Sequence, residues 1–382
     1  MAVSFFIVDM RTYVLYNDAI IIARGEALMA GSEDLKKILT AYRELSFSDR
    51  AAFYSTVSND ICVTNEHLQS FLIETRISGD QGCIYCGSTH VVKNGTRKDG
   101  TQRFLCRDCR KSFLPTSKSV TSRTRKRLSV WASYLNCMLE KKTLRETSEA
   151  CQISMATAFL WRHKILDGLH EMVGNVYLDG VVEADETFFN VSYKGNHKHF
   201  TLPRKPHKRG NSVHTKGLSS EKVCVPCAVS DAGLSYAKPA KLGKVSSDSI
   251  SEIFKGVISP RATLCTDNEK AYLSFALTNK NRLIQMDTDC RMTEQAGEKY
   301  GIQRINAYHS RLKGFLQRFR GVSTKYLENY LVWNDLLANS KRSREEILSL
   351  LLAQILTAPV TIRNQDVNKR PPIPGMPSFS TS

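Results

Sequence analysis

Four cysteines form two pairs whose spacing suits a metal ion. The pairs are Cys83 with Cys86 and Cys106 with Cys109, and 19 residues separate them. A Cys-x-x-Cys turn presents two thiolates to one ion, and two such turns complete a tetrahedral zinc site. An Asn-Gly and an Asp-Gly dipeptide between the pairs are typical of tight hairpin turns. The sequence therefore predicts a zinc ribbon over residues 79–120, in which a structural Zn²⁺ supplies stability that so small a core lacks.

Another Cys-x-x-Cys pair, Cys224 and Cys227, has a different context. It lies inside an apolar run without a second pair nearby, and we interpret it as part of a buried strand. The chain has 11 cysteines, an odd number, and neither a convincing signal peptide nor an apolar run long enough to span a membrane. These features favour a cytoplasmic protein with reduced cysteines and no membrane partner.

Carboxylates are crowded into two apolar segments, where a charge is costly unless it binds a cation or faces solvent. Glu183, Asp185 and Glu186 lie in one predicted strand, and the first two share a face. Asp267 ends a second apolar segment, residues 262–266, with a predicted helix behind it. Both places are candidate sites for a divalent cation held by oxygen ligands.

A third candidate contribution comes from a predicted helix near residues 303–319. Asn306 and Lys313 are seven residues apart, so they lie on one helical face, and His309 is close to that face. Other acidic side chains compete for the third position of a metal site, although we expect them to be surface charges: Glu294, Glu298 and Glu328. The residue pattern alone also allows Asn306 and Lys313 to belong to a solvated helix face.

The positive charge is concentrated in two blocks. The 382 residues carry a net charge of +17; residues 87–127 hold 12 basic and 2 acidic side chains, and residues 191–222 hold 8 basic and 1 acidic. Concentrated positive charge of this kind indicates a polyanionic partner, and we expect double-stranded DNA. The residues expected to contact DNA in and around these blocks are Arg103, Arg123, Arg125, Lys126, Arg127, Lys205, Lys208 and Arg209.

A pair of short helices follows the first basic block. Residues 143–151 predict a capped helix, residues 152–154 a compact turn and residues 155–165 a second helix, which is the order of a helix-turn-helix. The polar side chains expected to reach DNA from it, besides Ser154, are Thr157, Arg162 and His163. An ordinary helical hairpin is the alternative.

The remaining patterns divide the chain into regions. We expect an N-terminal helical region over residues 1–78, the zinc ribbon over 79–120, a helix-turn-helix region over 121–172, a catalytic domain over 178–340 and a Pro-rich disordered tail over 358–382. In the catalytic region the predicted strands are 180–189, 222–230, 234–240 and 262–266, and the predicted helices are 246–257, 268–277 and 303–337. Strands interleaved with helices predict an α/β or α+β domain.

The order of these motifs resembles a known family. The chain resembles insertion-sequence transposases of the zinc-ribbon, ISXO-like group. The segments that carry this resemblance are residues 182–189, Cys265-Thr266-Asp267, and residues 306–313, 319–327 and 330–333. The resemblance covers roughly residues 80–340. It implies a multidomain α/β protein whose RNase H-like, retroviral-integrase-like catalytic domain follows a zinc ribbon and a helix-turn-helix region.

The resemblance also implies roles for single residues. By position, Asp185 and Asp267 would be the first two metal-binding carboxylates, Asn306 would take the third position and Lys313 would be the accompanying basic residue. This Asp-Asp-Asn-Lys pattern departs from the Asp-Asp-Glu triad of the wider class, because Asn offers a neutral oxygen. The implied metal is Mg²⁺ or Mn²⁺, with Asp185, Asp267 and Asn306 as its protein ligands.

The implied activity is that of a DDE-type DNA transposase. Such an enzyme binds the terminal inverted repeats of its element, cleaves the strands and joins them to target DNA, and it generally acts as a homo-oligomer associated with the nucleoid. The alternative is a zinc-ribbon and helix-turn-helix DNA-binding regulator that has lost catalysis. A nuclease of the same fold, which cuts but never joins ends, is a second alternative.

Overall fold

The structure, a computed structural model, describes Ser46 and residues 65–77, 82–174, 176–194, 222–267, 269–286, 292–295, 297–370 and 373. The chain divides into two units, Met1–His67 and Leu68–Ser382. The N-terminal helical prediction falls almost entirely outside the described residues. Apart from the first residues of a helix over 65–76, every described helix and strand lies in the second unit.

A small antiparallel sheet carries the cysteine pairs. It has the strand order β1-β2-β3, with β1 at Val91–Thr96, β2 at Gln102–Cys106 and β3 at Ser112–Phe113. Its core contains little more than Ile77, Cys83, Phe104, Cys106 and Phe113. Helix α4 (Asn65–Arg76) leads into it, and the buried Arg76 side chain donates hydrogen bonds to the carbonyls of Pro115 and Ser117. So few apolar side chains make this a module that needs additional stabilisation.

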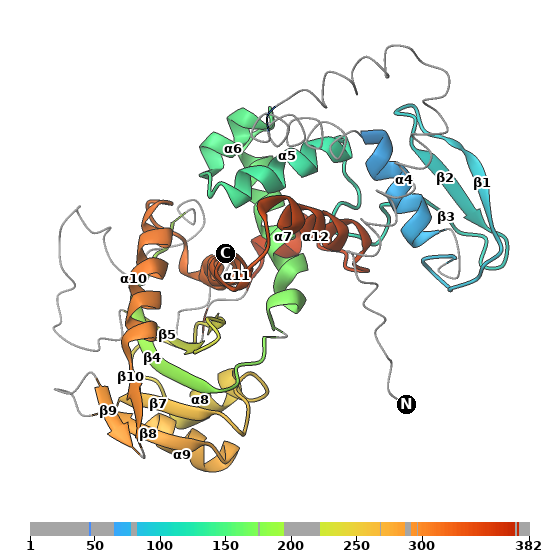
Figure 1. Ribbon diagram of the computed structural model, residues 1–382. Helices are drawn as coiled ribbons and strands as arrows, with labels where there is room; N and C mark the ends of the chain where they lie inside the picture. Colours follow the sequence, from blue (N-terminus) through green and yellow to red (C-terminus); the bar gives the residue numbers. More distant parts are fainter. Residues whose placement is uncertain are drawn as a thin grey trace. The chain divides into compact units, whose positions relative to one another are not determined.

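A group of helices follows the ribbon (Figure 1). These helices are α5 (Leu128–Leu139), α6 (Leu144–Ala150), α7 (Met155–Gly174) and, from later in the chain, α12 (Arg344–Thr357). Thr143 caps α6 through a reciprocal capping box with Glu146, as the sequence predicts for a helix that begins here. The rings of Trp131 on α5 and Trp161 on α7 stack with centroids 3.7 Å apart, which fixes these two helices against each other.

The largest sheet has the strand order β6-β5-β4-β7-β8. Its strands are β4 (Val181–Asn190), β5 (Lys222–Ser230), β6 (Ser235–Ala237), β7 (Thr263–Asp267) and β8 (Arg282–Met286). In this sheet β5 pairs antiparallel with both β4 and β6. On the other side of β4, strands β7 and β8 run parallel to it. A separate hairpin of β9 (Met292–Gln295) and β10 (Glu298–Gly301) precedes the next helix.

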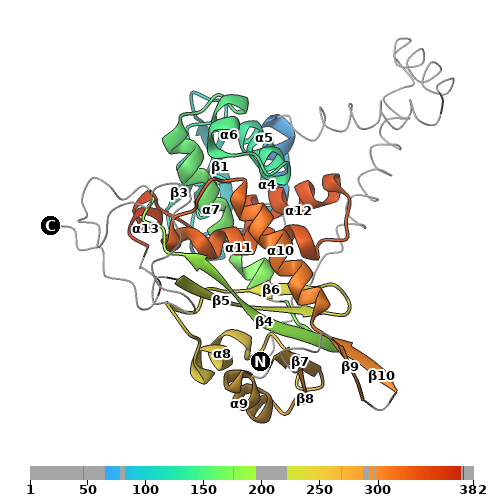
Figure 2. The same cartoon turned by 90° about the vertical axis from the view of Figure 1, so that its left-hand side faces the viewer.

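Helices cover both faces of this sheet (Figure 2). On one face α8 (Ser247–Phe254) and α9 (Lys270–Asn279) pack on Val182, Ala184 and Leu264. On the other face lie α10 (Gln303–Gln317) and α11 (Leu327–Asn339). Because strand residues alternate between faces, the even-numbered residues of β4 enter the first core and Glu183 and Asp185 face α10.

The predicted helix over residues 303–337 is in fact two helices. α10 ends at Gln317, and a short 3₁₀ helix at Thr324–Tyr326 leads into α11. Between them, Arg320 has φ 50° and Gly321 has φ 97°, a left-handed conformation that an α-helix cannot continue through. Tyr326, Tyr330 and Trp333 are buried core residues.

The tail predicted to be disordered, residues 358–382, contains an ordered segment. Residues 364–368 form helix α13 (Asn364–Asn368), and its Val367 is fully buried. Arg370 forms a salt bridge with Asp167 of α7 and a hydrogen bond with Asn329 of α11. A pattern rich in Pro and polar residues concealed these few anchoring contacts. Residues 374–382 lie outside the described part of the chain.

Asp335 of α11 is a buried carboxylate that joins three elements. It accepts hydrogen bonds from the Tyr308 hydroxyl at 2.6 Å, the Ser235 hydroxyl at 3.1 Å and the Ala237 backbone N–H at 2.9 Å. Burial raises the pKa of Asp335 to about 6, while these donors lower it. The carboxylate therefore ties α10 and α11 to the edge strand β6.

Replacing Asp335 with Ala is expected to lower the free energy of unfolding by about 2–4 kcal/mol, because it leaves buried donors without an acceptor. Urea denaturation of the full chain measures this loss. Asp248→Ala, at an exposed position in the first turn of α8, is the control and should change stability by about 0.5 kcal/mol or less. Equal stability of the two variants would contradict a structural role for Asp335.

Candidate functional site

Two neighbouring parallel strands bring two predicted metal ligands together. Asp185 lies on β4 and Asp267 is the last residue of β7, and both side chains are half-buried. Burial raises the pKa of Asp185 to about 6; the Glu186 N–H lowers it and the charge of Asp267 raises it further. The Asp267 charge acts on Asp185, so the two carboxylates lie near each other, and their predicted role as metal ligands stays a prediction.

Helix α10 brings His309 and Lys313 to the same site. His309 Nδ1 lies 3.8 Å from Asp185 Oδ2, and the Lys313 ammonium acts on the pKa of both Asp185 and His309. Asn306 is exposed one turn before His309, and Lys313 is exposed one turn after it. Burial, with a contribution from Lys313, lowers the pKa of His309 to about 4, so its imidazole is neutral at pH 7.

The sequence allowed Glu183 as an alternative metal ligand, but in the structure its carboxylate is bonded to helix α10. It is 2% exposed, and its carboxylate accepts hydrogen bonds from the Ile305 backbone N–H at 3.0 Å and from Arg304 Nη1 at 3.1 Å. The Ile305 N–H belongs to the first turn of α10, where backbone donors have no partner within the helix. Glu183 therefore holds the start of α10 on β4, two residues before Asp185. Its place on the same strand face as Asp185 is the signal that sequence reasoning could have used.

Glu186 lies on the opposite face of β4. Burial raises the pKa of Glu186 to about 8, and the charges of Asp185 and Asp267 raise it further. Among the described residues, Glu186 Oε1 and His309 Nε2 are buried polar atoms without a hydrogen-bond partner. A site with several carboxylates and unsatisfied polar atoms fits a cation, and Asp185, Asp267 and Asn306 offer the hard oxygen donors that Mg²⁺ prefers.

The rival acidic residues lie elsewhere in the fold. Glu294 and Glu298 are exposed on the β9–β10 hairpin, where Glu298 accepts a hydrogen bond from the Tyr300 hydroxyl. Glu328 is in the first turn of α11. None of the three contributes to the pKa values of Asp185 or His309.

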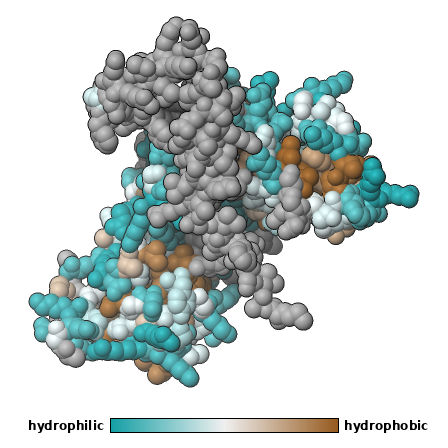
Figure 3. Space-filling model, turned by 45° about the vertical axis from the view of Figure 1, so that its right-hand side comes forward, coloured by the Kyte–Doolittle hydropathy of each residue, from teal (hydrophilic) through white to brown (hydrophobic). Residues whose placement is uncertain are grey.

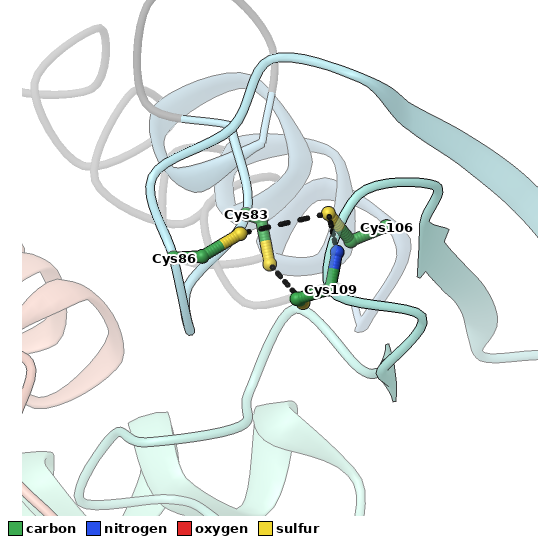
Figure 4. Close-up of side chains that lie close together, drawn as sticks. All are labelled: Cys83, Cys86, Cys106 and Cys109. Carbon is green, nitrogen blue, oxygen red and sulfur yellow. Dashed lines mark hydrogen bonds between the residues drawn. The ribbon is translucent and has the colours of Figure 1, made fainter.

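The two predicted cysteine pairs converge on one point (Figure 4). The Cys83 and Cys109 sulfurs are 3.7 Å apart, as are those of Cys86 and Cys106, and all four lie within 4.8 Å of one another. Four thiolates around one zinc ion at about 2.3 Å would be about 3.8 Å apart, so the geometry is compatible with a zinc ribbon. Backbone N–H groups of Cys109 and Asp108 lower the pKa of Cys106 to about 6, which favours its thiolate form.

Glycine is required where the first cysteine turn begins. Gly82 has φ +59°, and a Cβ at this position would lie 2.3 Å from the Ser88 carbonyl oxygen. That carbonyl accepts a hydrogen bond from the Cys83 backbone N–H at 2.7 Å. The close approach of the two backbones sets the position of Cys83.

Cys224 and Cys227 do not form a second cluster. Both are fully buried in β5, and they lie on opposite faces because they are three residues apart in a strand. Cys224 belongs to the core beneath α8 and α9, whereas Asp335 of α11 contributes to the raised pKa of Cys227. The interpretation of this pair as part of a buried strand is confirmed.

The residues predicted to contact DNA fall into three groups. The exposed ones are Arg103, Arg123, Arg125, Lys126 and Arg127, and Thr157 is half-buried near the exposed Ser154 at the start of α7. The predictions for Lys205, Lys208 and Arg209 lie outside the described residues. Arg162 and His163, the third group, require a correction.

Arg162 and His163 are core residues of α7, with 0% and 1% exposure. Arg162 donates hydrogen bonds to the Lys142 carbonyl and the Thr147 hydroxyl. His163 stacks on Tyr326 and accepts a hydrogen bond from Asn329. The prediction that both reach DNA is wrong for this structure, because the face of α7 that carries them packs against α11.

Known protein families identify the domain that contains the acidic site. Residues 177–332 match the family described as the ISXO2-like transposase domain. The matched part runs from the segment before β4 into α11 and includes all four predicted catalytic residues, so this region is similar to transposase domains of that family. The match confirms the resemblance of this part of the chain to insertion-sequence transposases of the ISXO2-like group. No curated protein matches the chain.

Among the described residues, no helix combines the length and apolar character needed to cross a bilayer. Hydrophilic residues cover much of the described surface on the face shown in Figure 3, with smaller hydrophobic areas between them.

Metal analysis tests the cysteine cluster directly. The purified chain is expected to contain one tightly bound zinc ion, and Cys106→Ser is expected to lose it, because one ligand of a closed tetrahedral site is removed. Elemental analysis with protein quantification measures the metal content. Cys224→Ser, which changes a cysteine outside the cluster, should retain the ion; loss of zinc in this control instead would contradict the assignment.

Proposed function

We propose that the chain is an insertion-sequence transposase that binds the inverted repeats at the ends of its element, cleaves the DNA strands and joins them to a target. The observation that supports this most is the meeting of three separate segments, β4, the end of β7 and α10, around Asp185 and Asp267. The strand order β6-β5-β4-β7-β8, antiparallel on one side and parallel on the other, fits an RNase H-like catalytic domain.

In this proposal the acidic site holds Mg²⁺ or Mn²⁺ through Asp185, Asp267 and Asn306. Bound divalent ions would activate the attacking hydroxyl and stabilise the leaving oxygen of an in-line displacement at phosphorus. Lys313 would bind a non-bridging phosphate oxygen beside the carboxylates, where its charge also opposes their mutual repulsion. Neutral His309 packs against Asp185 and adds no charge. Glu183 keeps α10 in place on β4, so that Asn306 and Lys313 stay beside the two aspartates.

The DNA-binding part of the proposal rests on exposed charge. The ribbon would hold Zn²⁺ and present Arg103, and the linker behind it presents Arg123, Arg125, Lys126 and Arg127. The α6–α7 pair would act as a helix-turn-helix in which Ser154 and Thr157, at the start of α7, approach the bases. Two ends must be joined together, so we propose a homo-oligomer that works on chromosomal DNA in the cytoplasm. The transposase family of the domain makes a non-catalytic regulator the less favoured interpretation.

Substitution of either aspartate tests catalysis. Asp185→Asn and Asp267→Asn are each expected to reduce metal-dependent cleavage and joining of end DNA by about 100-fold or more, since each removes an anionic ligand. Strand cleavage and strand transfer are followed on labelled DNA with Mg²⁺, Mn²⁺ or EDTA. Asp248→Asn is the matched control on the exposed surface. Retained cleavage in both site variants would refute the site, and cleavage without joining would indicate a nuclease.

Salt-dependent binding tests the basic linker. Replacing Arg123, Arg125, Lys126 and Arg127 together with Ala is expected to weaken DNA binding. The slope of log K against log salt should become shallower by about 0.9 for each phosphate that the variant no longer neutralises. Fluorescence anisotropy with labelled duplex at several salt concentrations measures both quantities. The control replaces four other exposed basic residues, Lys255, Arg261, Lys270 and Lys280. Equal weakening in both quadruple variants would mean that only net charge matters.

A further inference from the structure

A large cavity lies between the helix pair α6–α7 and the segment that follows α10. Its volume is about 1020 Å³, at the upper end of the usual size of ligand sites. One wall is formed by the start of α6 and the first half of α7, and the other by residues 318–326. The catalytic assignments above use none of the residues that line it.

One part of the lining is strongly basic. Arg145, Arg318 and Arg320 are exposed, and none of them forms a salt bridge within the described part of the chain. The acidic residue in the lining, Glu146, already accepts a hydrogen bond from the Thr143 backbone N–H at 2.7 Å. Lys194 donates to the carbonyl of Gly321 at 2.9 Å and so supports the wall. This arrangement favours an anionic group in the cavity.

A buried arginine adds a second, independent observation. Arg162 lines the cavity and is 0% exposed, and its Nε and Nη1 have no hydrogen-bond partner among the described residues. Its guanidinium lies 5.0 Å from the Trp333 ring centre, a contact that offsets part of the cost of burying the charge. The buried positive charge of Arg162 behind the lining adds to the positive electrostatic potential of the cavity, which favours an anionic ligand.

The remaining lining is apolar and includes a fixed aromatic ring. Phe159 is half-buried, and its ring meets those of His163 and Tyr326 edge-on, with centroids 4.7 Å and 5.3 Å away. Met155, which is 49% exposed, lies one turn earlier on α7. A flat aromatic ligand can pack on such a surface, and nucleic-acid bases do so without regard to sequence. The lining therefore combines sites for a base and for a phosphate.

The position of the cavity points to DNA as the source of the ligand. Arg318 follows Lys313 by five residues, which corresponds to about 7.5 Å along a helix axis. The opposite wall is the helix pair assigned above to DNA binding. A DNA strand that reaches both regions passes the mouth of the cavity.

We propose that the cavity binds one nucleotide that is unstacked from the bound DNA close to the active site. Its base would lie on Phe159 and Met155, and its phosphate would lie among Arg145, Arg318 and Arg320. This inference rests on the proposed DNA binding and extends it to a preference for an unpaired nucleotide. Unstacking costs least where a base is already unpaired, so such DNA binds more tightly.

The test compares two short duplexes of one sequence, fully paired or with a single unpaired 2-aminopurine nucleotide, using the full chain. The unpaired duplex is expected to bind about tenfold more tightly, and the 2-aminopurine emission is expected to fall as the base packs against Phe159. Phe159→Leu keeps an apolar side chain but removes the ring, and it should lose the preference and the emission change while paired-duplex affinity persists. Arg318→Glu should also lose the preference. Tyr177→Ala, an exposed aromatic residue outside the cavity, should retain it.

The outcomes separate this proposal from the proposed function. Equal affinity of the unchanged chain for both duplexes would overturn the cavity proposal and leave DNA binding intact. A preference that persists in both Phe159→Leu and Arg318→Glu would place the unpaired nucleotide elsewhere and would also overturn it. Failure to bind either duplex would overturn the cavity proposal and the transposase proposal together.

Discussion

Two like-charged carboxylates, Asp185 and Asp267, are held close enough for the charge of one to raise the pKa of the other. Without a cation this arrangement opposes folding, because repulsion and burial both disfavour the ionised forms. The surrounding structure must therefore hold β4 and β7 side by side through apolar packing on the opposite face. The buried Val182, Ala184 and Leu264 do this beneath α8 and α9. In the proposed site, a neutral Asn306 at the third position would add no further negative charge beside the two aspartates.

The place of α10 depends on polar anchors as well as on apolar packing. Near its start, Glu183 binds the Ile305 N–H, and one turn later Tyr308 binds the buried Asp335. These two contacts fix both the position of the helix along the sheet and its rotation, so His309 and Lys313 lie near Asp185. Removing either anchor leaves buried polar groups without hydrogen-bond partners, which is energetically costly. Buried hydrogen bonds therefore specify the position of a helix more closely than apolar contacts do.

Much of this organisation was accessible from the sequence, because it depends on local spacing. The cysteine pairs, the strand over residues 222–230 and the α6–turn–α7 succession follow directly from motif and period. The acidic residues were found because charges in apolar strands are conspicuous. The break after α10 was missed because Arg320 takes a left-handed conformation that glycine usually takes. Strand β8, the β9–β10 hairpin and helix α12 were also not recognised, since their short or uniform apolar patterns have no distinctive period.

The error at Arg162 and His163 has a physical cause that sequence patterns do not contain. Both are polar residues on a helix next to a basic block, yet α7 continues to residue 174 and packs against α11. There Asn329 donates hydrogen bonds to His163 Nδ1 and to Asp167, while burial lowers the pKa of His163 and keeps its imidazole neutral. Tertiary contacts thus decide the exposure of these side chains.

The same contacts connect α7 through α11 to α10, and so connect the proposed DNA surface to the proposed active site. Its first turn is exposed at Ser154, whereas its middle is bonded to Asn329 of α11. Six residues later on α11, Asp335 is bonded to Tyr308 of α10, the residue before His309. A helix that begins at the proposed DNA surface and is joined by buried hydrogen bonds to the proposed catalytic helix holds both in one fixed relation. DNA placed by α7 would then meet the aspartates at a defined position, and a cavity on this same path is where an unstacked nucleotide would be held.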